Sequence, residues 1–415
     1  MRDGWKALPL SDVVEHTIGG VWGGESGTDE VEVTVVRSTE FTKHGYLNFE
    51  TGVSRSIKLS QLKSRELKVG DILLEKSGGG PDQPVGRVVY VTGEIPNKFV
   101  CSNFVQLVRP NSKIVEPLLL FHIMWQWHAI NRTLEFQAQT TGIRNLRTPD
   151  YLEQEINLPP LPEQKRIVDL ISSVDSYIEV LQQQLESGKR SRNAVLHELL
   201  TAGGDDWFET TLGEICTEGL FADGDWVESK DQDPEGEYRL LQLADIGDGT
   251  FLNKSDRWMN REQFNRLSCT KLEVNDVLIA RMPDPIGRAC LFPDGLPTCA
   301  TVVDVAIVRT GDETLQKFLA LLINSSDFRT EAFSLLTGTT RQRISRGNLA
   351  KIAFAIPPTE KQLEIVNLIS LFDIEIAKSA QVVEGAKQLR SGLLSDLLSG
   401  KHEIPTSYDK VMGAA

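Results

Sequence analysis

The sequence predicts an α+β protein of mixed α/β character, in which two domains alternate with two long helices that pair as an antiparallel coiled coil. Three observations predict this fold: an internal repeat, a heptad pattern in each copy, and two intervening segments of domain size. The repeat relates residues 158–178 to residues 356–376 at a constant offset of 198 residues. Because each copy of a repeat forms the same unit, we expect a pseudo-two-fold molecule built twice from one plan.

The repeat divides the chain into five parts. Two segments precede the repeated elements, and each is long enough to bury a core of its own. The predicted parts are a first domain at 1–157, a helical spacer at 158–204, a second domain at 205–355, a second helical spacer at 356–403 and a C-terminal tail at 404–415.

Both domains contain strand and helix patterns. Runs rich in β-branched residues at Arg87–Thr92 and Thr301–Arg309 predict strands, and amphipathic runs at Pro117–Asn131 and Thr314–Leu336 predict helices. Short motifs also recur, with Leu67–Leu74 similar to Leu272–Ile279 and Pro84–Arg87 similar to Pro285–Arg288. The sequence between these motifs is largely dissimilar. Similar scaffolds with divergent loops indicate two sites of one type but different preference.

Each helical spacer carries an apolar stripe in alternating steps of three and four residues. A proline pair precedes each helix and glycines follow it, which are common start and stop signals. The stripes predict mutual pairing, whereas packing of each stripe on its own domain is the alternative. The predicted seam comprises Ile171, Val174, Ile178, Leu185 and Arg192 in the first copy, and Ile369, Phe372, Ile376, Val383 and Arg390 in the second.

The start of each helical spacer is similar to a motif of a known family. The residues concerned run from Leu158 to Ile167 and from Ile356 to Ile365, and the upstream segments Thr141–Leu146 and Gly338–Ile344 add to the likeness. On these residues the chain resembles a specificity (S) subunit of Type I restriction–modification systems over nearly its whole length. The second motif departs from the pattern, because Glu360-Lys361-Gln362 replaces the usual proline-glutamate-glutamine order.

The resemblance implies two target-recognition domains that read a bipartite, asymmetric site in double-stranded DNA. It implies two methyltransferase (M) subunits and additional restriction (R) subunits as partners in host defence. The chain itself is then expected to be no enzyme and to hold no cofactor. S-adenosylmethionine would bind in the M subunits, and ATP and Mg in the R subunits, so that the assembled complex is a DNA adenine methyltransferase and endonuclease.

Composition limits the function classes. No 18-residue apolar run and no signal-peptide pattern is present, so we expect a cytoplasmic protein without a membrane partner. Five cysteines without a C-x-x-C motif favour a reducing compartment and predict no metal site. The formal net charge of −14 opposes non-specific DNA affinity, although a local basic face can still bind.

Candidate DNA-binding residues are basic or amide side chains near the helical spacers and in one basic run. Arginine suits guanine edges and phosphates, and asparagine suits adenine. A solvated basic turn, or for the basic run the wet side of a helix, is the alternative. The candidates are Arg144, Asn145 and Arg147 in the first domain, and Lys254, Arg257, Arg261, Arg341, Arg343 and Arg346 in the second.

The sequence lacks the common catalytic motifs that would indicate an enzyme. The sequence contains no P-loop, no dinucleotide-binding glycine motif, no H-E-x-x-H and no G-x-S-x-G. Two alternatives stay open at this point. A specificity subunit of a fused restriction–methylation enzyme would have the same layout, and a coiled-coil scaffold that binds no DNA would fit the acidity but not the duplicated domains.

Overall fold

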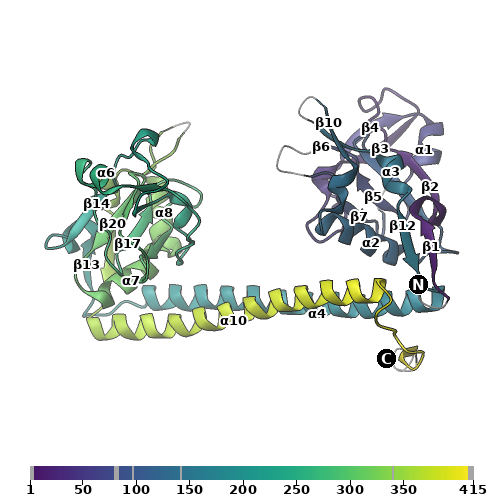
Figure 1. The fold of residues 1–415 in the computed structure, drawn as a ribbon. Coiled ribbons are helices and arrows are strands. Elements are labelled where there is room, and N and C mark those ends of the chain that lie inside the picture. The colour runs from purple at the N-terminus through teal and green to yellow at the C-terminus, as the bar shows by residue number, and fades with distance from the viewer. Residues whose placement is uncertain (1–3, 79–83, 96–97, 141–142, 339–340, 410–415) are drawn as a thin grey trace. The chain divides into compact units, whose positions relative to one another are not determined.

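The computed structural model describes residues 4–78, 84–95, 98–140, 143–338 and 341–409. The chain forms two compact units, one from residues 1–180 and 383–415 (unit 1) and one from residues 181–382 (unit 2). Each unit holds one of the predicted domains with one half of each long helix (Figure 1). The boundary between the two units therefore falls near the middle of each long helix rather than at its end. The reason is that the two halves of each helix pack on different domains.

Unit 1 contains two sheets at its centre, and the helix α2 (Pro117–Ala129) packs on one of them through a shared apolar core. The first sheet has the strand order β2 (Val14–Gly19), β9 (Val105–Pro110), β5 (Ile72–Glu75) and β7 (Val88–Tyr90). The second sheet has the order β4 (Val53–Ile57), β3 (Val31–Val36) and β8 (Phe99–Cys101). Smaller sheets join β10 (Gln137–Thr140), β11 (Ile143–Leu146) and β6 (Ser77–Gly78), and β1 (Lys6–Pro9) with β12 (Glu155–Leu158). The short helices are η1 (Leu10–Val13), η2 (Ser38–Glu40), α1 (Leu59–Arg65), η3 (Arg132–Phe136) and α3 (Thr148–Leu152).

Unit 2 repeats this plan. Its first sheet has the strand order β14 (Leu220–Asp223), β20 (Val305–Arg309), β17 (Val277–Ala280) and β18 (Ala289–Leu291). Its second sheet has the order β16 (Trp258–Met259), β15 (Tyr238–Leu241) and β19 (Cys299–Thr301). The strand β13 (Phe208–Thr211) pairs with β21 (Ala353–Ile356) as β1 pairs with β12. The helices are α5 (Leu212–Ile215), η4 (Ser229–Asp231), η5 (Leu243–Asp245), α6 (Arg261–Arg266), α7 (Glu313–Ile323), α8 (Ser326–Ser334) and α9 (Arg346–Leu349). The predicted α+β fold with an internal repeat is confirmed.

Two predicted elements of unit 2 are each divided in two. The run predicted to be helical at 314–336 forms two helices, α7 and α8, because the Ser325 side chain accepts a hydrogen bond from the amide of Phe328 and caps a new helix. The run Thr301–Arg309 joins the end of β19 to β20 through a turn in which the Val305 amide donates to Val302 O at 2.9 Å. That turn carries Asp304, which lies in the candidate site described below.

The repeated Leu67 and Leu272 motifs form the same turn and strand, closed by the same ion pair. In unit 1, Arg109 contacts both carboxylate oxygens of Asp71 at 2.7 and 2.8 Å. In unit 2, Arg309 contacts both oxygens of Asp276 at 2.7 and 2.6 Å. Both carboxylates are buried and each also accepts a backbone amide hydrogen. A buried charge that is fully paired in this way tolerates loss of its partner poorly.

We expect the substitution Arg309→Met to lower the free energy of unfolding by about 3 kcal/mol, because it leaves the buried Asp276 carboxylate without its cation. Urea unfolding of the full chain measures the loss. The matched control is Lys317→Met, which removes the exposed pair with Glu313 on α7 and should cost less than about 0.5 kcal/mol. Equal losses in the two variants would contradict a structural role for the Arg309–Asp276 pair.

The long helices α4 (Leu161–Thr201) and α10 (Thr359–Leu398) begin in the same way. The buried amide of Gln164 donates from Nε2 to Pro159 O at 2.9 Å, and that of Gln362 donates to Pro357 O at 2.8 Å. The glutamine shared by the two repeats thus ties each helix to the proline pair before it. Gly203 and Gly400, both with positive φ, follow the two C-termini as the glycine stop signal predicts.

The two helices lie side by side within each unit, and an ion pair joins them in each (Figure 1). In unit 1, Arg390 binds both carboxylate oxygens of Asp175 at 2.7 and 2.8 Å. In unit 2, Arg192 binds those of Asp373 at 2.8 and 3.1 Å. From Asp175 to Arg192 the chain advances 17 residues along α4, and from Arg390 to Asp373 it goes back 17 along α10. The antiparallel coiled coil is thereby confirmed, with one register in both units.

The residues of the predicted seam differ in burial. Arg192 and Arg390 form the ion pairs just described, each with a side chain only 16% exposed. Small side chains let the helices approach, since a Cβ atom at Gly188 would lie 3.7 Å from Ile376 Cγ1. The buried seam residues are Ile171, Ile178, Ile369 and Val383, and the partly buried ones are Val174, Leu185, Phe372 and Ile376.

Unit 1 adds a contact between its domain and the helix pair. His122 on α2 is buried, and its Nδ1 lies 3.1 Å from Nη2 of Arg390. Burial, together with the adjacent guanidinium, lowers the pKa of His122 to about 4. The imidazole is therefore neutral at pH 7, and its Nδ1 can accept a hydrogen bond from the guanidinium. The sequence of α7, which follows β20 in unit 2 as α2 follows β9 in unit 1, contains no histidine.

Candidate nucleic-acid interface

In unit 2, a buried arginine lies where β17 ends. Arg281 donates from Nε to Ile344 O at 3.0 Å and from Nη1 to Val303 O at 3.2 Å, and it forms an ion pair with Asp223. Burial lowers the pKa of Arg281, and the Asp223 carboxylate opposes that shift. Because a guanidinium stays protonated in proteins, the end of this strand carries a fixed positive charge.

Two further arginines share one carboxylate beside it. Arg343 Nε lies 3.3 Å from Asp304 Oδ1, and Arg341 Nη2 lies 3.7 Å from Asp304 Oδ2. Arg343 also donates from Nη2 to Val303 O at 3.1 Å. The Arg341 side chain is 76% exposed and that of Arg343 is 34% exposed. The cluster therefore presents guanidinium donors to solvent, and the buried Arg281 shares the acceptor Val303 O with Arg343.

Unit 1 has the same backbone arrangement at the end of β5. The Lys76 amide donates to Phe104 O at 2.9 Å, as the Arg281 amide donates to Asp304 O at 2.9 Å. The carbonyls of Lys76 and Arg281 in turn accept from the amides of Leu146 and Ile344, at 2.8 and 3.0 Å respectively. Through these matching hydrogen bonds, Lys76 corresponds to Arg281, Phe104 to Asp304, and Asn145 to Arg343.

The chemistry at these equivalent positions differs. Asn145 lies on β11 and its Oδ1 accepts from Ser77 Oγ at 2.7 Å, whereas Arg343 is held by backbone and carboxylate oxygens. Arg144, also on β11, is partly buried. A depression of about 450 Å³ borders Lys76 and is lined also by Gln106, Ser11, Thr148, Pro149, Leu152 and Glu153. One scaffold position thus carries a lysine–amide set in unit 1 and an arginine–carboxylate set in unit 2.

The remaining candidates lie elsewhere on their units. Arg147 precedes α3 and is used internally, because it pairs with Asp150 at 2.7 Å and donates to Glu135 O at 2.9 Å. Arg346 starts α9 and contacts Phe221 O at 3.4 Å. Residues 141–142 and 339–340, which contributed to the family resemblance, lie outside the described residues.

The basic run of unit 2 does not form one helix face. Lys254 and Arg257 are exposed and lie outside any helix or strand, whereas Arg261 is the first residue of α6. Arg261 Nε donates to the hydroxyl oxygen of Tyr238 at 3.2 Å and lies 3.7 Å from Glu237. The structure therefore brings together Arg341 and Arg343, and separately Arg144 and Asn145, but it does not unite the basic run with either pair.

Sequence reasoning missed Lys76, Arg281 and Asp304, and it also missed a tryptophan in each unit. Gly20-Val21-Trp22 and Gly224-Asp225-Trp226 make matching hydrogen bonds to the strands beside them. Arg55 covers the Trp22 ring, with its guanidinium carbon 4.6 Å from the ring centroid, whereas Trp226 is 69% exposed. The repeated Gly-x-Trp triplet was the signal that could have found these positions.

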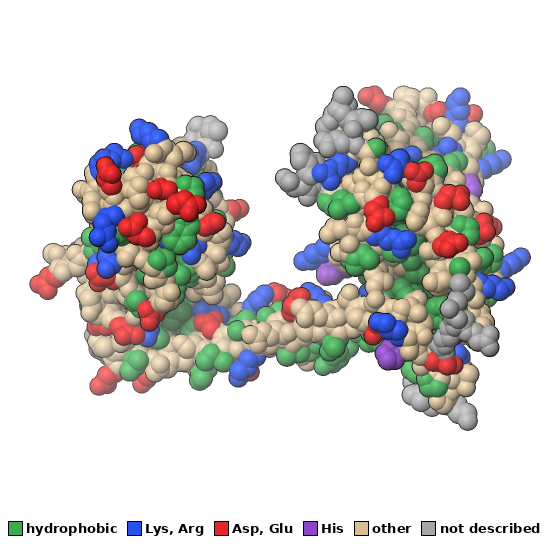
Figure 2. Space-filling model, viewed as in Figure 1, with side chains coloured by type: hydrophobic (Ala, Val, Ile, Leu, Met, Phe, Trp, Pro, Cys, Tyr) green, Lys and Arg blue, Asp and Glu red, His purple; other side chains and the backbone are tan. Residues whose placement is uncertain are grey.

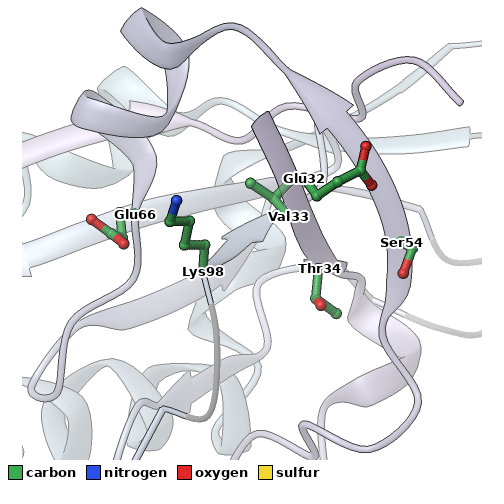
Figure 3. A pocket seen from close by; sticks show the side chains of 6 residues that line it. All are labelled: Glu32, Val33, Thr34, Ser54, Glu66 and Lys98. Atoms are coloured by element: carbon green, nitrogen blue, oxygen red, sulfur yellow. The ribbon is translucent and has the colours of Figure 1, made fainter. Parts of the chain in front are cut away.

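One other depression, of about 470 Å³, opens on β3 and β4 of unit 1, with Glu66 and Lys98 at one end and Glu32 and Ser54 at the other (Figure 3). Glu32 is already engaged, since it accepts from Ser26 Oγ at 2.6 Å and from the Gly27 amide at 2.7 Å. These hydrogen bonds lower the pKa of Glu32. With its carboxylates in the majority, this hollow does not suit a polyanion.

The fold and these surfaces define a class of protein: a duplicated scaffold that presents two chemically different polar surfaces and is joined by a helix pair. The sequence matches the profile of the Type I restriction modification DNA specificity domain at residues 2–187 and again at 204–384. The chain belongs to this family, and the predicted role as its DNA-recognition subunit is confirmed.

Individual relatives agree with this assignment. The chain is similar to the type I restriction enzyme MjaVIII specificity subunit of Methanocaldococcus jannaschii, with 22% identity over 96% of this chain and 93% of the relative. It is also similar to the type I restriction enzyme EcoBI specificity subunit of Escherichia coli, with 23% identity over 74% of this chain and 72% of the relative. A chain from a solved structure, described as addressing complex assembly and conformational transition of the type I R-M system, shares the fold. That likeness has a TM-score of 0.62 and 18% identity, and covers 96% of this chain and 98% of the other.

Proposed function

We propose that this subunit reads a bipartite, asymmetric site in double-stranded DNA, with one half-site read by each unit. The observation that carries the proposal is the matched position at the ends of β5 and β17, where one backbone arrangement displays different side chains. Lysine and asparagine in unit 1, and arginines in unit 2, are donors suited to base edges and phosphates. Two such surfaces of unlike chemistry favour two unlike half-sites.

The helix pair is the proposed docking surface for two methyltransferase subunits. Figure 2 shows hydrophobic side chains at the surface of the helices. Exposed apolar residues include Leu368, Leu371 and Ile374 in unit 2, and Tyr177, Val180 and Leu389 in unit 1. Apolar side chains on helices that already have one partner indicate that another protein covers them. Restriction subunits would join this assembly for cleavage.

Chemistry in the complex is assigned to the partners. S-adenosylmethionine is proposed to bind in the methyltransferase subunits, and ATP and Mg in the restriction subunits, while this chain supplies sequence recognition without catalysis. Among the described residues no helix is long and apolar enough to cross a membrane. We also find no group of three or more metal-ligating side chains in those ranges.

We expect Arg343→Ala and Arg341→Ala to weaken binding of the assembled complex to its DNA site. A lost bidentate base contact should cost about 1–3 kcal/mol and relax specificity at one position of one half-site. A lost phosphate contact should instead weaken binding to all sequences and reduce the salt slope by about 0.9. Fluorescence anisotropy titrations at several salt concentrations separate the two outcomes.

The matched control for these variants is Lys317→Ala, which removes one positive charge from α7 of the same unit. It should change neither affinity nor salt slope by a comparable amount. If both arginine variants keep the affinity, the motif and the salt slope of the unmodified complex, the arginine cluster is only a solvated turn.

A further inference from the structure

Asp304 occupies the centre of the arginine cluster in unit 2. Its two carboxylate oxygens face different arginines, Arg343 at 3.3 Å and Arg341 at 3.7 Å, and its backbone oxygen accepts the amide hydrogen of Arg281 at 2.9 Å. The Asp304 side chain is only 16% exposed. An acidic residue at the middle of a surface expected to bind a polyanion calls for an explanation, because a carboxylate repels phosphate.

The environment explains why a carboxylate is present. Arg281, Arg341 and Arg343 place three permanent positive charges close together, and Asp223 compensates only the first by direct contact. Without Asp304, Arg343 and Arg341 would repel each other and Arg281, and long side chains under repulsion spread over many rotamers. One carboxylate between two guanidinium groups offsets that repulsion and limits their rotamers.

The pairing leaves donors unused. Arg343 Nε is buried against Asp304 and is not accessible to DNA, but the Arg343 side chain as a whole is 34% exposed. Arg341 forms an ion pair with Asp304 but, at 3.7 Å, no hydrogen bond, and its side chain is largely exposed. A guanidinium has five N–H donors, so both arginines can be held by Asp304 and still bind a base or phosphate.

Unit 1 supplies an internal comparison. At the position equivalent to Asp304 it has Phe104, which is 48% exposed, and no arginine corresponds to Arg341, because that place is taken by Ile143. The carboxylate thus occurs in the unit that has arginines at positions 341 and 343, and an aromatic ring replaces it in the unit that has Ile143 and Asn145 at the equivalent positions.

We infer that Asp304 is a positioning residue of the second recognition surface, which holds Arg343 and Arg341 in the orientation that reads DNA. This inference rests on the proposed function. Asp304 then contributes to specificity rather than to affinity. Its negative charge lowers attraction to any DNA, while its contacts with both arginines restrict which base edges they reach.

The test uses the full chain assembled with its methyltransferase subunits and the substitution Asp304→Asn. Binding is titrated against the cognate site, every single-base variant of the site, and unrelated DNA. We expect discrimination at one or two positions of one half-site to fall about tenfold, which is the range of one bidentate contact. The other half-site should be unaffected, and affinity for unrelated DNA should rise. Asp304→Glu, which keeps the charge, should retain the motif.

Asp248→Asn is the charge-matched control, because Asp248 also pairs with an arginine, Arg329, at 2.5 Å in the same unit. It should leave discrimination intact. Asp304→Phe provides a second variant with the residue that the scaffold accepts in unit 1, and it should lose discrimination as Asp304→Asn does.

Full discrimination in folded Asp304→Asn or in folded Asp304→Phe overturns the inference, and so does an equal loss in Asp248→Asn. A wild-type complex that shows no sequence preference would instead refute the proposed function itself. The two failures are therefore distinguishable.

Discussion

Lengthening both long helices by one heptad is expected to lengthen the spacer of the recognised site and leave both half-sites unchanged. Seven residues inserted after Gln183 in α4 and after Gln381 in α10 fall between the two ion pairs, Asp175–Arg390 and Arg192–Asp373. A heptad preserves the phase of the seam, with a rotation of only about 20°. It adds about 10 Å of helix, which corresponds to about three base pairs of duplex.

Motif calling on DNA methylated by the variant complex measures the spacer. The control is an insertion of seven residues in α4 alone, which should break the pairing with α10 and lower stability rather than yield a defined longer spacer. If the double insertion gives a folded, active complex with the original spacer, the helices are mere linkers and do not set the distance between half-sites.

Exchange of residues 205–355 for the corresponding segment of a relative is expected to replace one half of the methylated motif completely. The exchanged domain must keep its contact with the helices, since Leu196, Ile365 and Ile369 belong to the apolar core of unit 2. These residues lie outside the exchanged segment and are retained. The second half-site should then be that of the relative, because the exchanged residues carry the surface that reads it.

The reciprocal exchange of residues 1–157 should replace the other half and leave the first unchanged. Methylation sequencing of each chimaeric complex gives both halves in one measurement. A change in both halves after a single exchange would show that the two surfaces do not read DNA independently.

The helical part of the fold could be predicted from local sequence. The proline pairs, the shared glutamine and the heptad phase are signals within a few residues of one another, and α4 and α10 begin and end close to the predicted limits. The run predicted to be helical at 314–336 is helical but is divided in two, because Ser325 caps a new helix and the apolar period alone does not reveal such a break.

The recognition surface was less accessible to sequence reasoning. Arg343 and Asn145 were singled out because they precede the helical spacers, but Arg281 and Asp304 lie 62 and 39 residues before Arg343 in the chain and meet it only through strand pairing. Arg147 was selected by the same local argument, and the structure shows it paired with Asp150. Charge type and proximity to a motif cannot separate an arginine that is engaged by neighbours in its own domain from one whose donors stay available.

Methylome sequencing of the host strain with and without this gene tests most directly whether the two units read different half-sites. We expect a motif of two different half-sites separated by unspecified bases, which is present in the parent strain and lost on deletion. Complementation with the intact gene should restore it. A palindromic or contiguous motif, or a set of methylated motifs unchanged by the deletion, would contradict the account.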